Sequence, residues 1–121
     1  MAKLMDLIVR HTIDGIHNFA YADLVESTYQ GKARIVRVSV ENDTGGGLAP
    51  PSLQVQTTAA VADQGVLTGA RIAPDVAKSF ELDGSQHFAV GGADTIISVA
   101  QYTGDGGSGS PVAEMIVTVE L

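Results

Sequence analysis

The amino-acid sequence predicts an all-β protein, an antiparallel β-sandwich of about 7–8 strands in one domain covering residues 1–121. Val, Ile and Thr, which suit a pleated surface, make up 31 of the 121 residues. Apolar and polar side chains alternate with a period of two in several segments, as they do in half-buried strands. Turn signals containing Gly, Pro, Asp or Asn separate these segments, and none of them shows the spacing of a long helix.

The clearest alternation lies in residues 4–13, 34–41, 53–61 and 115–121, which are predicted as strands. In the first strand, His11 is expected on the apolar face, while Leu4 and Ile8 lie on the otherwise polar face. Glu41 and Glu120 are expected to be exposed, so changing them should matter little for folding. The residues predicted to lie in the core of the second and fourth strands are Val36, Val38, Val40, Val117 and Val119.

Three further segments are predicted as strands: 66–72, 79–90, which turns at Asp83 and Gly84, and 95–102. Residues 19–30 fit either an edge strand or a short helix capped by Asn18, and the neighbouring strands favour the strand. Residues 74–78 can form one helical turn, because Pro74 suits a first-turn position.

Composition and charge exclude several classes of protein. Fourteen acidic residues oppose seven basic ones, and the net charge of −7 argues against nucleic acid as a partner. The chain has no Cys, which excludes disulfides, thiolate metal sites and Cys nucleophiles. Asp6 and Arg10 interrupt the apolar N-terminal run, so neither a signal peptide nor a membrane span is expected.

The motifs of common active sites are incomplete. Gly31 and Lys32 are followed by Ala33, which does not fit a phosphate-binding loop. Ser108 lies in a glycine-rich stretch that opens no helix, so it does not fit a nucleophile elbow. The protein is therefore predicted not to be an enzyme and to have no catalytic residues, cofactor or metal.

Histidines and acidic turn residues are the side chains whose chemistry would suit a metal ion. His11 and His17 can approach each other across a turn at Asp14 and Gly15, but a zinc site needs further converging ligands. We expect His11 to be half-buried and the other two histidines to be exposed. The aspartates in glycine-rich turns are expected to be ordinary turn residues rather than calcium ligands. The histidines are His11, His17 and His87, and the turn aspartates are Asp43, Asp83, Asp94 and Asp105.

The segment 78–90, KSFELDGSQHFAV, resembles the strand–turn–strand found late in bacterial immunoglobulin-like domains. The resemblance implies that 95–102 and 112–121 form a closing hairpin in an immunoglobulin-like sandwich. The chain departs from antibody-type domains in lacking Cys and Trp. A jelly roll fits the strand count nearly as well, so both sandwich types remain open.

As a short, acidic, β-rich chain without a leader, the protein also resembles the decoration or cement proteins of tailed-phage capsids. The resemblance implies a structural virion protein on the capsid surface, synthesised in the host cytoplasm. Such a protein stabilises the head by bridging major capsid proteins, commonly as a homotrimer. The alternative is an immunoglobulin-like binding module that recognises a glycan or a protein.

Three apolar residues are candidates for contact with another subunit or with the capsid. Leu4 and Ile8 lie on the polar face of the predicted first strand, and Leu121 ends the chain. A small monomer would expose these side chains, and exposed apolar surface marks interaction sites.

Overall fold

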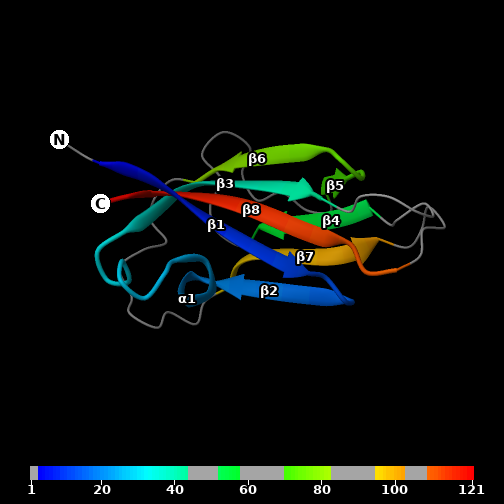
Figure 1. The fold of residues 1–121 in the computed structure, drawn as a ribbon, viewed down its shortest axis with the longest axis horizontal. Helices are drawn as coiled ribbons and strands as arrows, with labels where there is room; N and C mark the ends of the chain where they lie inside the picture. Colours follow the sequence, from blue (N-terminus) through cyan, green and yellow to red (C-terminus); the bar gives the residue numbers. More distant parts are fainter. Residues whose placement is uncertain (1–2, 44–51, 58–69, 83–94, 103–108) are drawn as a thin grey trace.

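The computed structural model describes residues 3–43, 52–57, 70–82, 95–102 and 109–121 (Figure 1). This part of the chain forms eight strands and one short helix. In chain order the elements are β1 (Leu4–Thr12), β2 (Ile16–Ala20), α1 (Tyr21–Leu24), β3 (Arg34–Asn42), β4 (Ser52–Thr57), β5 (Ala70–Ile72), β6 (Ala77–Glu81), β7 (Thr95–Tyr102) and β8 (Val112–Glu120). In this described part, the four-residue α1 is too short to cross a membrane.

The strands form two four-stranded antiparallel sheets that pack together as a β-sandwich, which confirms the predicted fold class. Sheet A has the order β1-β8-β3-β6, and sheet B has the order β2-β7-β4-β5. Figure 1 shows both chain ends at one end of the sandwich, where β1 begins and β8 ends.

The strand order is that of a jelly roll rather than an immunoglobulin-like sandwich. β1 pairs with β8, β2 with β7, β3 with β6, and β4 with β5, so the strands pair as in a long hairpin rolled up on itself. Apart from β4 and β5, consecutive strands belong to different sheets. The expected closing hairpin of 95–102 with 112–121 is therefore wrong, because β7 lies in sheet B and β8 in sheet A.

The core lies between the two sheets, and the alternation predicts most of it correctly. Val38, Val40, Val117 and Val119 are buried as expected. On sheet B, the inward positions of β4 are also buried, as the alternation of 53–57 predicts. The large side chains that fill the centre are Phe19, Phe80, Ile13, Leu24, Ile35, Leu53, Ile72, Ile96, Ile97 and Met115.

Val36 is only partly buried, and the prediction for this residue is wrong. The pairing of β3 with β8 shifts between Ile35 and Arg37, which makes Val36 the extra residue of a β-bulge. The bulge turns Ile35 inward, and its side chain is fully buried. The carbonyl of Val36 accepts a 2.9 Å hydrogen bond from the backbone nitrogen of Leu82.

The segment 19–30 follows the less favoured alternative, a short helix, although Asn18 does not cap it. β2 ends at Ala20, and α1 begins with the buried Tyr21. The Tyr21 hydroxyl donates a 2.7 Å hydrogen bond to the carbonyl of Ala33, which holds the returning chain against the helix. The carboxylate of Asp23 accepts a 2.8 Å hydrogen bond from the backbone nitrogen of Ala20.

The expected helical turn at 74–78 is also wrong. The Ala73 carbonyl accepts a 3.1 Å hydrogen bond from the Val76 nitrogen, which closes a tight turn between β5 and β6. Asp75 has φ 65°, so the third residue of the turn lies in the left-handed region. Pro74 before a residue with positive φ matches a type II turn, and β6 starts directly afterwards at Ala77.

Candidate functional site

The outer face of sheet A carries an ordered pattern of side chains. Its strands are antiparallel, and on both sides of the bulge at Val36 the opposed residues form rows that cross the sheet. We name each row by its β1 residue. The rows are Leu4–Glu120–Arg34, Asp6–Thr118–Arg37–Glu81, Ile8–Ile116–Ser39–Ser79 and Arg10–Glu114–Glu41–Ala77.

The Ile8 row is free of charge and lies in the middle of this face. Ile8 and Ile116 are directly opposed partners, and they are 68% and 38% exposed. The row continues across β3 and β6 with two small hydroxyl side chains, Ser39 and Ser79. An uncharged row, apolar on β1 and β8 and hydroxylated on β3 and β6, therefore crosses the sheet between two rows that carry charges.

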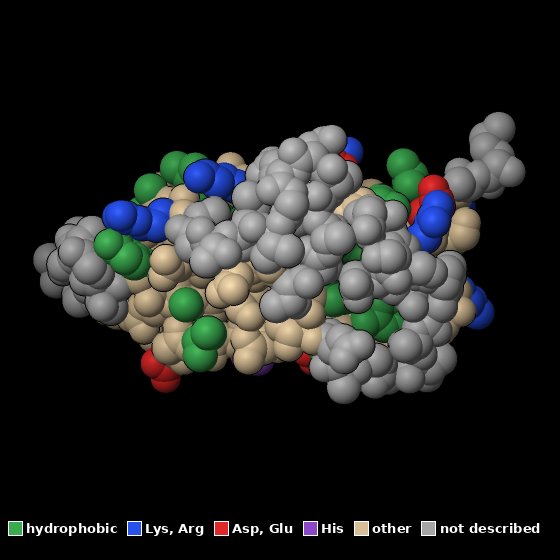
Figure 2. Space-filling model, turned by 180° about the vertical axis from the view of Figure 1, so that it is seen from behind, with side chains coloured by type: hydrophobic (Ala, Val, Ile, Leu, Met, Phe, Trp, Pro, Cys, Tyr) green, Lys and Arg blue, Asp and Glu red, His purple; other side chains and the backbone are tan. Residues whose placement is uncertain are grey.

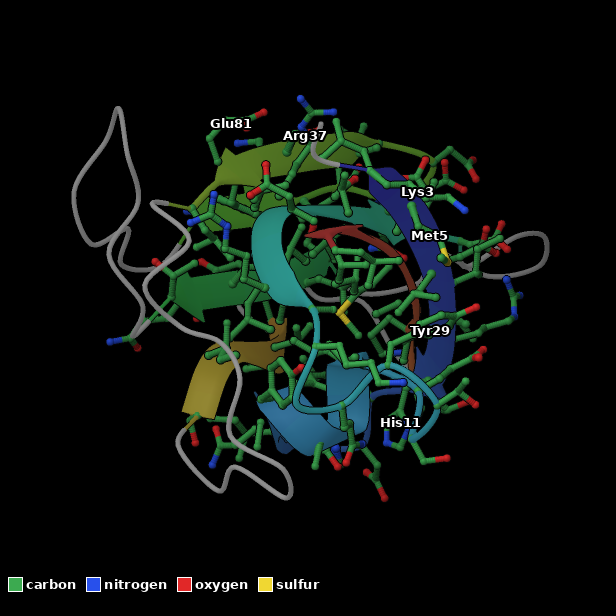
Figure 3. All side chains as sticks on the ribbon, turned by 90° about the vertical axis from the view of Figure 1, so that its left-hand side faces the viewer. Lys3, Met5, His11, Tyr29, Arg37 and Glu81 are labelled. Atoms are coloured by element: carbon green, nitrogen blue, oxygen red, sulfur yellow. The ribbon has the colours of Figure 1, made fainter. Side chains whose placement is uncertain are left out.

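Several charged side chains of the two flanking rows have hydrogen-bond or ion-pair partners within the chain. In the Asp6 row, the Thr118 hydroxyl donates to the Asp6 carboxylate at 2.7 Å, and Arg37 Nε lies 2.5 Å from a Glu81 oxygen. Figure 3 shows Arg37 and Glu81 side by side at the rim of the molecule. Their side chains remain 50% and 43% exposed, so both are accessible to a partner.

In the Arg10 row, Arg10 Nη1 lies 2.5 Å from Asp43 and 2.7 Å from Glu114. The hydrogen bond with Asp43 is the main cause that raises the pKa of the Arg10 guanidinium above its ordinary value. Asp43, one of the acidic turn residues with calcium-binding chemistry, is thus an ion-pair partner of Arg10. Asp83, Asp94 and Asp105 lie outside the described residues.

The second surface is the end of the sandwich that carries the chain termini, which we call the terminal end. It contains Leu4, 61% exposed, and Leu121, 40% exposed. The Leu121 nitrogen donates a 2.9 Å hydrogen bond to the Lys3 carbonyl, which extends the β1–β8 pairing to the last residue. Figure 3 looks at this end and shows Lys3 and Met5 along β1.

The three residues predicted as contacts do not all lie on one surface of the structure. Leu4 and Ile8 share the outer face of sheet A, whereas alternation along β8 puts Leu121 on the opposite side from Glu120. Ile116 belongs with Ile8, and sequence reasoning missed it as a contact residue. Its signal was present, because Ile116 is an apolar residue on the polar side of its strand, but the pairing with Ile8 is not visible in the sequence.

Glu120 is less exposed than expected. Its side chain is 24% exposed, and it accepts hydrogen bonds from Arg34, one of them from Nε at 2.6 Å. The pair lies in the Leu4 row at the terminal end. Glu41 is exposed, as predicted.

His11 and His17 meet where the chain passes from β1 in sheet A to β2 in sheet B. Their ring centroids are 4.1 Å apart, and the His17 ring lies 4.3 Å from that of the buried Phe19. Both histidines are partly buried, so the prediction of an exposed His17 is wrong. His87 lies outside the described residues, which contain no group of three or more His, Cys, Asp or Glu side chains able to hold a metal.

Figure 2 shows the side of the molecule opposite to that in Figure 1. The described hydrophobic side chains visible there lie in separate small groups. No protein-family model matches the chain, and no curated protein matches it.

Proposed function

We propose that this protein is a structural virion protein, a decoration protein that binds the capsid surface of a tailed phage. It would stabilise the head by bridging major capsid proteins. The observation that carries this proposal is the terminal end, where Leu4 and Leu121 expose apolar side chains beside both chain ends. Exposed apolar residues at one end of a rigid sandwich suit attachment to another protein.

The jelly-roll strand order supports the same proposal by analogy of fold. Viral capsid proteins use this fold, but lectins and cupins use it too, so the fold alone assigns no function. Its two packed sheets provide a stable body that presents the terminal end to a partner. The immunoglobulin-like alternative lacks this support, because the strand order differs from that of such domains.

The repeated binding sites of a capsid lattice would strengthen the attachment of an oligomeric protein. A lattice of identical capsid subunits offers many equivalent sites, and an oligomer that engages several of them gains effective concentration without strong individual contacts. A homotrimer is the oligomer that the resemblance to decoration proteins implies. In this proposal the terminal end of each copy contacts the major capsid protein.

The test is sedimentation of purified protein with phage heads assembled without it. We expect the protein to sediment with the heads at saturable stoichiometry, and Leu4→Ser with Leu121→Ser to reduce binding at least about tenfold. Ile16→Ser is the matched control, because Ile16 is 64% exposed on β2 of sheet B. It should bind normally.

Two results contradict the proposal. One is failure of the wild-type protein to bind the heads, and the other is equal loss of binding in the double variant and in the control. Binding of the isolated protein to a glycan array, without binding to heads, would support the glycan-recognising alternative instead.

A further inference from the structure

We propose that the outer face of sheet A binds a second copy of this chain, face to face, about a two-fold axis lying along the Ile8 row. The inference rests on the register and charges of this face and not on the proposed capsid function, although Leu4 lies at the margin of the same face. The face on its own produces a dimer, in place of the trimer that the resemblance implies.

The Ile8 row of one copy can pack against the Ile8 row of the other. A two-fold axis along the row keeps each strand opposite the same strand of the second copy. Ile8 then lies against the second copy's Ile8, Ile116 against Ile116, and Ser39 against Ser39. Two exposed isoleucines from each copy cover one another, which removes the most exposed apolar side chain of this face from water.

The flanking rows exchange places under the same rotation. The Asp6 row of one copy faces the Arg10 row of the other, so Asp6 lies opposite the second copy's Arg10. On β3, Arg37 lies opposite the second copy's Glu41. Each of these contacts occurs twice in the dimer, and each joins opposite charges.

On the other two strands, β8 and β6, no like charges lie opposite each other in this dimer. The Thr118 hydroxyl, which donates its hydrogen bond to Asp6 of its own chain, faces the second copy's Glu114 and carries no charge to oppose it. Glu81 faces the small side chain of Ala77 and keeps its own partner Arg37. All four strands of the face are therefore compatible with this axis.

A two-fold axis along the strands fits much less well. It places β1 opposite β6 and β8 opposite β3, so Asp6 faces Glu81, and Glu114 faces Glu41. Both are contacts between like charges, which are unfavourable in a covered interface. The charges of this face therefore favour the axis along the Ile8 row over the axis along the strands.

The area of the face is sufficient for a modest dimer. Three nine-residue strands and the five-residue β6, spaced about 4.8 Å apart and rising about 3.4 Å per residue, cover roughly 520 Å² per copy. The total of about 1,040 Å² is close to the approximately 1,000 Å² expected of a specific interface. Arg10 on the edge strand β1 and Arg37 on the inner strand β3 are both half-exposed, so their charges can direct pairing.

The first experiment measures self-association of the full chain by sedimentation equilibrium. The wild-type protein should be a reversible dimer, and Ile8→Asp should raise the dissociation constant roughly a hundredfold or more. Ile16→Asp is the matched control, because Ile16 is 64% exposed but lies on sheet B, and its dimer should be unchanged. A wild-type monomer, a trimer, or equal effects of the two variants would overturn the proposal.

The second experiment exchanges charges and tests the axis itself. Arg37→Glu and Glu41→Arg should each weaken the dimer about tenfold, because each creates two contacts between like charges. The double variant restores opposite charges across the interface and should dimerise within about threefold of wild type. A double variant as weak as the single variants, with circular dichroism showing all of them folded, would exclude this axis. Wild-type dimers that fail to bind phage heads would contradict only the proposed function.

Discussion

The side chain of Asn42, at the end of β3, donates a 3.1 Å hydrogen bond from Nδ2 to the carbonyl of Ile72, at the end of β5. Asn42 is fully buried, and β3 and β5 belong to different sheets. The backbone of Asn42 also bonds to Asp75 and Val76 in the following turn. One buried amide thus connects sheet A to the end of sheet B and to the chain that returns from it.

Asn42→Ala should lower the free energy of unfolding by about 1–3 kcal/mol, because it removes a buried hydrogen bond and leaves the carbonyl of Ile72 without this donor. Gln56→Ala, on an exposed position of β4, is the control and should change stability by less than about 0.5 kcal/mol. Urea unfolding of both variants measures the difference. Equal stabilities would show that the link between the sheets contributes little.

The bulge in β3 leaves Val36 partly buried and Val38 fully buried, so their truncation should have different effects on stability. Val38→Ala should cost about 1–3 kcal/mol of unfolding free energy, because Val38 is 1% exposed and its truncation leaves a cavity. Val36→Ala should cost less than about 1 kcal/mol, since Val36 is the partly buried extra residue. Thermal and urea unfolding compare the two. A larger loss for Val36 than for Val38 would contradict the bulge.

These valines show how far alternation can predict the fold. A period of two is a local property, so it locates β1, β3, β7 and β8 and puts Val38 and Val117 inside. A bulge changes the face of the next residue without changing composition, which is why alternation puts Val36 on the wrong side. The strand order also escapes prediction, since β1 pairs with β8 at the other end of the chain.

The pair of Arg34 and Glu120 should contribute modestly to stability. The two side chains are 41% and 24% exposed, so solvent screens their attraction and the coupling energy should be about 0.5–1 kcal/mol. A double-mutant cycle with Arg34→Ala and Glu120→Ala isolates this energy. A coupling energy near zero would restore the expectation, drawn from sequence, that Glu120 matters little for folding.

The candidate site is only partly predictable for a related reason. Leu4 and Ile8 are recognisable as apolar residues on a polar strand face, and their exposure of 61% and 68% agrees with that interpretation. The partnership of Ile8 with Ile116 requires the β1–β8 register, which joins residues more than a hundred positions apart. The opposite charges of Arg37 and Glu41 become meaningful only once the row between them is known.

The most direct test of the two-fold contact uses a single thiol placed on the Ile8 row. The chain has no Cys, so Ser39→Cys carries one reactive group, and the axis puts it opposite its own copy across sheets packed about 10 Å apart. A short bis-maleimide should link two Ser39→Cys chains into a covalent dimer, and adding Ile8→Asp should abolish the product. Ser27→Cys, exposed outside sheet A, should give no such product under the same conditions. Failure of Ser39→Cys to cross-link, or equal cross-linking through Ser27→Cys, would contradict the account.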